Sequence, residues 1–210
     1  MKKIIQIVLA VVIVALGYYA VDMVYSSIHF QKQTEARKAV VIERIKDIRS
    51  AQRSFKQVNQ RYTASFDTLI NFVLNDSLVM ERKLVDEDDS VAMARLKAKR
   101  IKNIEKFKVA VIDTVFGEKK LTPEQVRNLR FIPFAAEGTE FIMDAGMFTT
   151  ESKVIVPVFE CKAPYKEFLA DMDRQELINL INECKSVYEV YPGIKVGAMD
   201  AATNDAGNWE

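Results

Sequence analysis

The sequence contains few of the residues on which most enzyme and metal sites depend. Its 210 residues include one histidine, His29, and two cysteines, Cys161 and Cys184. A histidine metal site, a Ser/His/Asp triad or a Cys/His pair would have to use His29, which lies just past an apolar N-terminal run. No carboxylate, lysine or tyrosine pair has a spacing typical of a shared pocket. We therefore expect no enzyme, with no catalytic residues, no metal and no cofactor.

The sequence also lacks an excess of charge and is poor in chain breakers. Thirty basic residues balance 29 acidic ones, and the seven glycines and five prolines exclude a low-complexity chain. Nucleic-acid-binding domains usually carry a clear basic excess, so we expect no nucleic-acid partner. The acidic residues 86–89 lack the ligand spacing and glycine of an EF-hand. The basic residues among 95–102 lack interleaved aromatics for base stacking, so both groups are expected to be solvated surface.

What the sequence does contain is one long apolar run near its N-terminus. Lys2 and Lys3 precede residues 4–20, which carry no charge and include Gln6 as the one strongly polar residue. A helix of this length covers ~26–30 Å, about the hydrocarbon thickness of a bilayer. Residues 1–30 are thus predicted to be a cytoplasmic tip and transmembrane anchor. The predicted anchor residues are Ile4, Ile5, Ile7, Val8, Leu9, Val11, Val12, Ile13, Val14 and Leu16.

A cleaved signal peptide is the alternative for this segment. Ala15-Leu16-Gly17 fits a cleavage site, but the helical pattern continues past Ala20 without a breaker, which favours retention. The basic tip favours a cytoplasmic N-terminus, although three basic residues between positions 32 and 38 oppose it. We predict a single-pass protein of the inner (cytoplasmic) membrane with its C-terminal domain in the periplasm.

Residues 31–62 contain neither glycine nor proline and predict a helical stalk continuous with the anchor. Val41, Ile45, Ile48 and Phe55 follow a three-and-four spacing, with polar residues at positions 52 and 59 of the same series. This partner-helix seam either binds another helix in a coiled coil or covers the sheet of the chain's own domain. In the first case the other helix could belong to a second copy of the chain, which would make a homo-oligomer.

The remainder alternates short strands and helices and predicts a periplasmic α/β domain over residues 63–198, followed by a flexible tail at 199–210. Ser65 is a predicted N-cap, Thr122 to Gln125 form a predicted capping box, and another helix opens near Ser90. Strands are predicted at 107–116, 131–134, 140–144, 154–161 and 194–198, and an amphipathic helix at 173–188. The predicted fold class is α+β: a transmembrane helix continuing into a long helical stalk, then a small α/β domain.

The two cysteines lie on the inward faces of a predicted strand and of the predicted helix that follows it. Cys161 and Cys184 either form a disulfide, which suits an oxidising periplasm, or remain two buried thiols. Their spacing is not that of a redox or zinc motif.

Three resemblances bear on function. Ile48 to Phe55 and Asn59 to Tyr62 resemble the long first helix of type IV pilin-like proteins, although no glutamate precedes Glu35. The layout resembles the bitopic inner-membrane scaffold proteins of type IV pilus and type II secretion systems, which implies a ferredoxin-like domain. Phe66 to Ile70 and Gly207 to Glu210 are similar to segments of uncharacterised single-pass envelope proteins of Bacteroidota.

Together these features predict a non-enzymatic, membrane-anchored structural or scaffold subunit of a bacterial cell-envelope assembly. Such an assembly would be a secretion, pilus-like or energy-transducing machine. The expected partners are the lipid bilayer and other membrane-protein subunits. The alternatives are a pilin-like filament subunit and a membrane-anchored enzyme of unknown chemistry.

Overall fold

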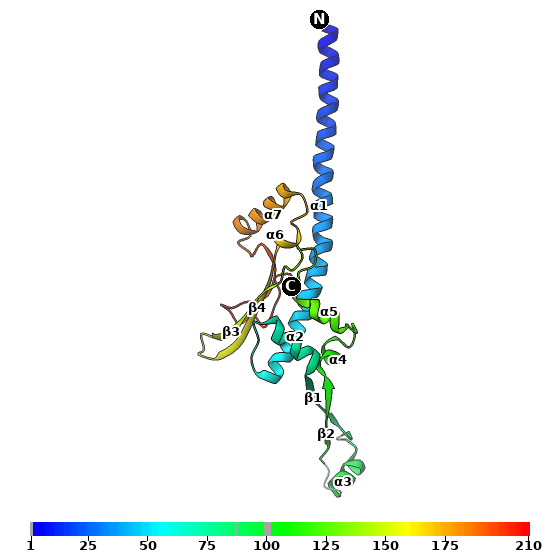
Figure 1. Cartoon of the computed structure of the whole chain (residues 1–210), viewed down its shortest axis with the longest axis vertical. Coiled ribbons are helices and arrows are strands. Elements are labelled where there is room, and N and C mark those ends of the chain that lie inside the picture. Colours follow the sequence, from blue (N-terminus) through cyan, green and yellow to red (C-terminus); the bar gives the residue numbers. More distant parts are fainter. Residues whose placement is uncertain (1, 87, 99–101) are drawn as a thin grey trace.

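The computed structural model describes residues 2–86, 88–98 and 102–210. A long helix carries a mixed helical and sheet body on its second half, and an arm projects from that body at the end opposite the N-terminus (Figure 1). The acidic residues 86–89 and the basic residues among 95–102 include three that lie outside the described residues: Glu87, Lys99 and Arg100. The elements, in chain order, are α1 (Lys2–Asn59), α2 (Phe66–Asn75), β1 (Ser77–Lys83), α3 (Ser90–Ala98), β2 (Ile104–Ala110), α4 (Val111–Phe116), α5 (Pro123–Arg127), the 3-10 turn η1 (Asn128–Arg130), β3 (Ile142–Thr149), β4 (Ile155–Pro164), α6 (Tyr165–Phe168), α7 (Arg174–Ser186) and β5 (Gly193–Gly197).

The predicted continuity of anchor and stalk is confirmed, because α1 is a single helix of 58 residues. It contains no proline, and Gly17 is its one glycine. At a rise of 1.5 Å per residue it is ~87 Å long. The mixed helix-and-sheet class with a long N-terminal helix is also as predicted.

The second half of α1 is the central helix of the body rather than a separate stalk. Val41, Ile45 and Ile48 are completely buried and Phe55 is nearly so, all within one core cluster with residues of the sheet. Of the two alternatives for this seam, the structure therefore shows the second: the seam packs against the chain's own domain. A partner helix cannot reach these side chains in the folded protein, which corrects the partner-helix reading.

Gln52 explains how a polar residue fits into the seam. Its side chain is completely buried, donates to the carbonyl of Thr63 at 2.6 Å and accepts from the Thr63 amide at 3.2 Å. A buried amide is tolerated when its polar atoms are paired. Gln52 thereby holds the chain reversal that follows the end of α1.

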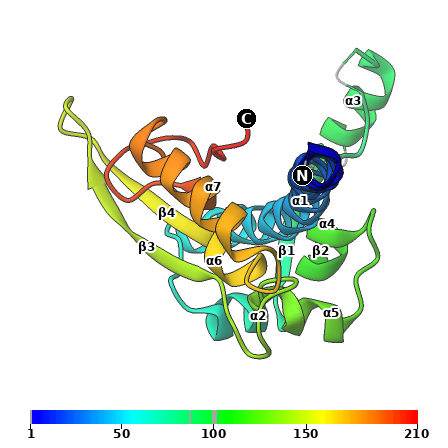
Figure 2. The same cartoon turned by 90° about the horizontal axis from the view of Figure 1, so that it is seen from above.

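The main sheet is antiparallel, in the order β3-β4-β5, and packs against α1. Phe159, Cys161 and Ala163 alternate along β4 and face the core. Viewed along α1, helices α6 and α7 lie beside the sheet and α2, α4 and α5 lie on the other side of the body (Figure 2). A ferredoxin-like arrangement needs a βαββαβ order, which this three-stranded sheet does not show.

Local capping signals were read correctly from the sequence. Ser65 accepts a hydrogen bond from the Thr68 amide and begins α2. Thr122 and Gln125 form the predicted capping box of α5, with Pro123 in its first turn. Asp173 caps α7, which covers most of the predicted helix at 173–188.

Two predicted strands are wrong in part or in whole. Of residues 107–116, the first four belong to β2, but Val111–Phe116 form the short helix α4, in which Val111 and Phe116 are buried. Residues 131–134 form one isolated bridge, Phe131 to Glu140, and then a turn. Pro133 has no amide to donate, and Phe134 has a φ of 64°, which no strand accommodates. The predicted strands at 140–144, 154–161 and 194–198 correspond to β3, β4 and β5 with shifted ends.

The C-terminal segment is docked rather than a loose tail. Gly207 bridges to Val196 beside β5, and Asn208 donates its amide to the Lys195 carbonyl at 3.0 Å. Trp209 packs against the core cluster. The segment predicted as a flexible tail at residues 199–210 is therefore held on the body, where Gly207 and Asn208 cover one edge of the sheet.

Candidate functional site

The first half of α1 is an apolar helix without any packing partner. The described side chains from Leu9 to His29 are exposed, apart from a half-buried Ser27. Val14 is 72% exposed and Tyr18 is 75% exposed. Of the predicted anchor residues, Leu9, Val11, Val12, Ile13, Val14 and Leu16 are among the exposed ones; Ile4, Ile5, Ile7 and Val8 are helical, but their side chains lie outside those described. Soluble proteins rarely expose so large a contiguous apolar surface.

Among the described residues, α1 is the one helix that is long enough and apolar enough to cross a membrane. Tyr18, Tyr19 and Tyr25 lie toward its body-side end, where aromatic residues suit a membrane–water interface. Among the described side chains of the helix, the first buried one is Phe30, followed by Thr34. The bare segment therefore leads directly into the core.

Charged side chains on α1 fasten the body to the helix from several sides. Arg37 forms a bidentate pair with Asp171, between α6 and α7, and donates to the carbonyl of Phe168 at 2.9 Å. The hydrogen bonds from Arg37 lower the pKa of the Asp171 carboxyl. Arg44 donates to the carbonyl of Asn128 in η1 at 2.6 Å. These pairs restrict rotation of the body about the helix.

The C-terminal segment forms a further attachment, which we call the tail clasp: Arg49, Arg53, Tyr62, Asp205 and Glu210. The Tyr62 hydroxyl donates its one proton to the Asp205 carboxylate, whose two oxygens lie 2.8 and 2.9 Å away, and Asp205 also accepts from Arg53 at 3.1 Å. Arg49 pairs with Glu210 at 2.6 Å and stacks over the ring of Trp209. Burial, followed by the hydrogen bond to Asp205, raises the pKa of the Tyr62 hydroxyl. A satisfied buried carboxylate of this kind is a structural lock.

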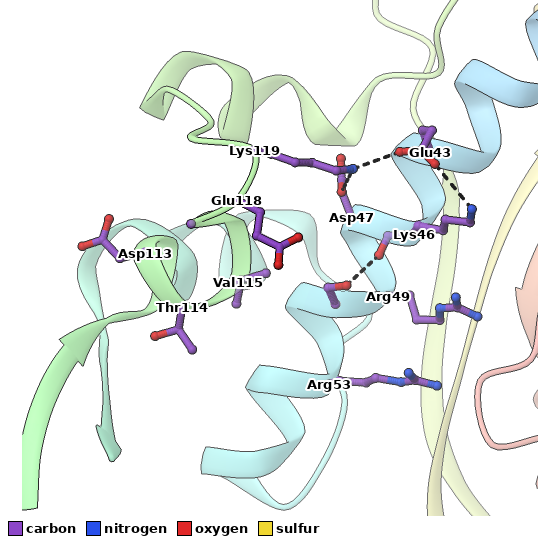
Figure 3. A pocket seen from close by; sticks show the side chains of 12 residues that line it. Glu43, Lys46, Asp47, Arg49, Arg53, Asp113, Thr114, Val115, Glu118 and Lys119 are labelled. Atoms are coloured by element: carbon purple, nitrogen blue, oxygen red, sulfur yellow. Dashed lines mark hydrogen bonds and ion pairs between the residues drawn. The ribbon is translucent and has the colours of Figure 1, made fainter. Parts of the chain in front are cut away.

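A cleft of 710 Å³ lies between α1 and the region around α4 (Figure 3). Lys119 crosses it to pair with Glu43 at 3.1 Å and with Asp47 at 2.5 Å. Its hydrogen bond lowers the pKa of the Glu43 carboxyl. Arg49 and Arg53 point away from α4 (Figure 3) and bond to Glu210 and Asp205, their partners in the tail clasp. The cleft is thus crossed by ion pairs that join α4 to α1.

The cysteines are free thiols in the structure, the second of the two alternatives for them. Cys161 on β4 is completely buried and Cys184 on α7 is 8% exposed. Burial raises the pKa of both thiols, and the neighbouring Lys38 only partly offsets it at Cys184. Neither thiol has the exposed, electropositive surroundings of a reactive cysteine.

No family model matches the chain, and no curated protein or solved structure matches it either. Within residues 2–86, 88–98 and 102–210, no group of three or more His, Cys, Asp or Glu side chains is placed to hold a metal ion.

Sequence reasoning found the bare helix but missed the residues that fasten the body to it. A continuous apolar run is visible in one segment, whereas Arg37 and Asp171 are 134 positions apart. The density of arginines at 37, 44, 49 and 53 of α1 was the one available signal.

Proposed function

We propose that this protein is a non-enzymatic, single-pass membrane protein whose body serves as a scaffold subunit of a bacterial cell-envelope assembly. The observation that carries the proposal is the union of a bare apolar segment and a core helix in one unbroken α1. A bilayer supplies the cover that this segment otherwise lacks.

The continuity of α1 also bears on how the body would act. Because α1 is both anchor and core helix, no flexible linker separates the body from the membrane. Arg37, Arg44 and the tail clasp hold the body in one rotational setting on the helix. The arm of β1, α3 and β2 then projects away from the membrane (Figure 1). Fixed height and orientation suit a subunit that presents surfaces to other proteins.

The proposed location is the inner membrane, with the body in the periplasm. The basic tip, Lys2 and Lys3, supports a cytoplasmic N-terminus. Protease added to spheroplasts should digest the body, and intact cells should protect it. Protection in spheroplasts as well would reverse the topology and leave the anchor itself in place.

Alkaline carbonate extraction of membranes tests the anchor. The full chain should remain in the membrane pellet. The variant Val11→Lys/Val14→Lys should be released, because each lysine at the centre of a span costs about 2.5–3.5 kcal/mol. Val58→Lys is the matched control, since Val58 is an exposed residue of α1 within the body and should leave the protein in the pellet. Release of the unaltered chain would overturn the proposal.

A further inference from the structure

The two edges of the main sheet differ in whether another segment covers them. The side of β5 that faces away from β4 is covered by the C-terminal segment, through the Gly207 bridge to Val196 and the bonds between Asn208 and Lys195. β3 forms the opposite edge, and its backbone bonds to β4 alone among the described residues. Open edges are normally blunted by lysine, proline or a bulge. β3 has no lysine and no proline, and its register with β4 is unbroken over all eight residues.

The register identifies which backbone groups face outward. Thr150 donates to the carbonyl of Val154, so the bonded pairs that continue from it are Phe148 with Val156 and Gly146 with Val158. Pro157, which has no amide, lies opposite Met147 in a non-bonded pair, as this alternation requires. The amides and carbonyls of Met143, Ala145 and Met147 therefore point away from β4.

The side chains of β3 indicate which kind of added strand would fit beside this edge. Asp144 is the one charged residue of β3; it is exposed and forms no ion pair with any described residue. Its neighbour across the ladder, Glu160, is already paired with Lys162 at 2.5 Å and Lys195 at 3.7 Å. Met143, Ala145 and Met147 share the other face of the strand. A strand added here would place an apolar row beside these three residues and a cation beside Asp144.

We propose that the β3 edge is a strand-addition site for an extended segment of another protein, in which apolar residues flank a lysine or arginine. Backbone bonding to a sheet edge supplies affinity, and the side chains of alternate positions supply specificity. A second copy of this chain fits less well, because its β3 has no cation to set beside Asp144. The site is independent of the anchor, so its failure would leave the membrane proposal unaffected.

The test uses the full chain in detergent micelles and two capped octapeptides. Both alternate threonine and valine; one carries a central lysine in the threonine series and the other carries glutamate there. Hydrogen exchange of single amides, followed by NMR, should slow at Met143, Ala145 and Met147 with the lysine peptide. Fluorescence anisotropy should show the glutamate peptide binding about two- to fivefold more weakly, the range of an exposed ion pair.

Three variants make the assignment specific. Ala145→Pro removes one outward amide without removing a bond to β4 and should abolish binding, and a thermal melt checks that the variant remains folded. Asp144→Lys should reverse the preference between the peptides. Asp113→Lys makes the same charge change at an exposed site on α4 and should leave the preference as it was. Unslowed exchange at the three amides would overturn the proposal. Slowing that rises with protein concentration alone would show a second copy at the edge and would overturn it too.

Discussion

At the scale of single residues, two buried polar contacts near the end of α1 join it to the segments that pack on it. Gln52 pairs with both backbone groups of Thr63, and Tyr62 pairs with Asp205. An unpaired buried group of this kind costs about 1–3 kcal/mol, so each pair favours one arrangement of the segments that it joins. Gln52, a polar residue in the apolar series, is thus a tertiary contact and does not set the register of a coiled coil.

One prediction at this scale concerns the labelling of the two cysteines. Alkylation of the native protein should leave Cys161 unlabelled, because the thiol is fully buried and burial raises its pKa above its ordinary value. Unfolding without reductant should label both Cys161 and Cys184, as shown by mass analysis. Two labels that appear only after reduction would demonstrate a disulfide and would contradict the free thiols of the structure.

At the scale of elements, α1 passes from its exposed apolar segment into the core at Phe30 without any break in the helix. Helical hydrogen bonding is the same in lipid and in a protein core, so one helix suits both surroundings. What differs is the side-chain pattern: apolar on all faces before residue 21, and apolar on one face from residue 41 to 55.

Ile48→Asp tests the direction of that apolar face. The side chain is completely buried in the body, so an unpaired carboxylate there should lower the free energy of unfolding by about 3–5 kcal/mol. Denaturant titration followed by the fluorescence of Trp209 measures the loss. Val58→Asp, on an exposed position of the same helix, should change stability little. An Ile48→Asp protein as stable as the parent would return the seam to a partner helix.

At the scale of the whole molecule, ion pairs across long sequence distances hold the body on α1. Asp171, Glu43 and Glu210 accept hydrogen bonds from Arg37, Lys119 and Arg49 respectively, and each bond lowers the pKa of its carboxyl. These attachments come from three different parts of the chain. Loss of their charge should therefore loosen the body as a unit.

Acidification is the corresponding prediction. A carboxyl whose pKa is lower in the folded state stabilises the protein fully above its unfolded pKa, and this contribution is lost as pH falls through the folded value. The Tm should therefore be steady at neutral pH and should fall below about pH 4.5. Asp171→Asn should flatten part of that fall, and added salt should reduce it, because the carboxylates of these pairs are exposed to solvent. A Tm that does not depend on pH between 3 and 6 would contradict the role given to these pairs.

The sequence by itself determined those features that depend on residues a few positions apart. The apolar run, the unbroken length of α1, and the caps at Ser65 and Thr122 are local, since each depends on propensity or on bonds within one turn. Only the tertiary structure decided which way the α1 seam faces, why 111–116 is a helix, and that the last residues dock. Those outcomes rest on contacts such as Tyr62 with Asp205, 143 positions apart, which no local pattern encodes. The open edge of β3 likewise follows from the strand order, because a strand becomes an edge only through what the rest of the chain leaves unpaired.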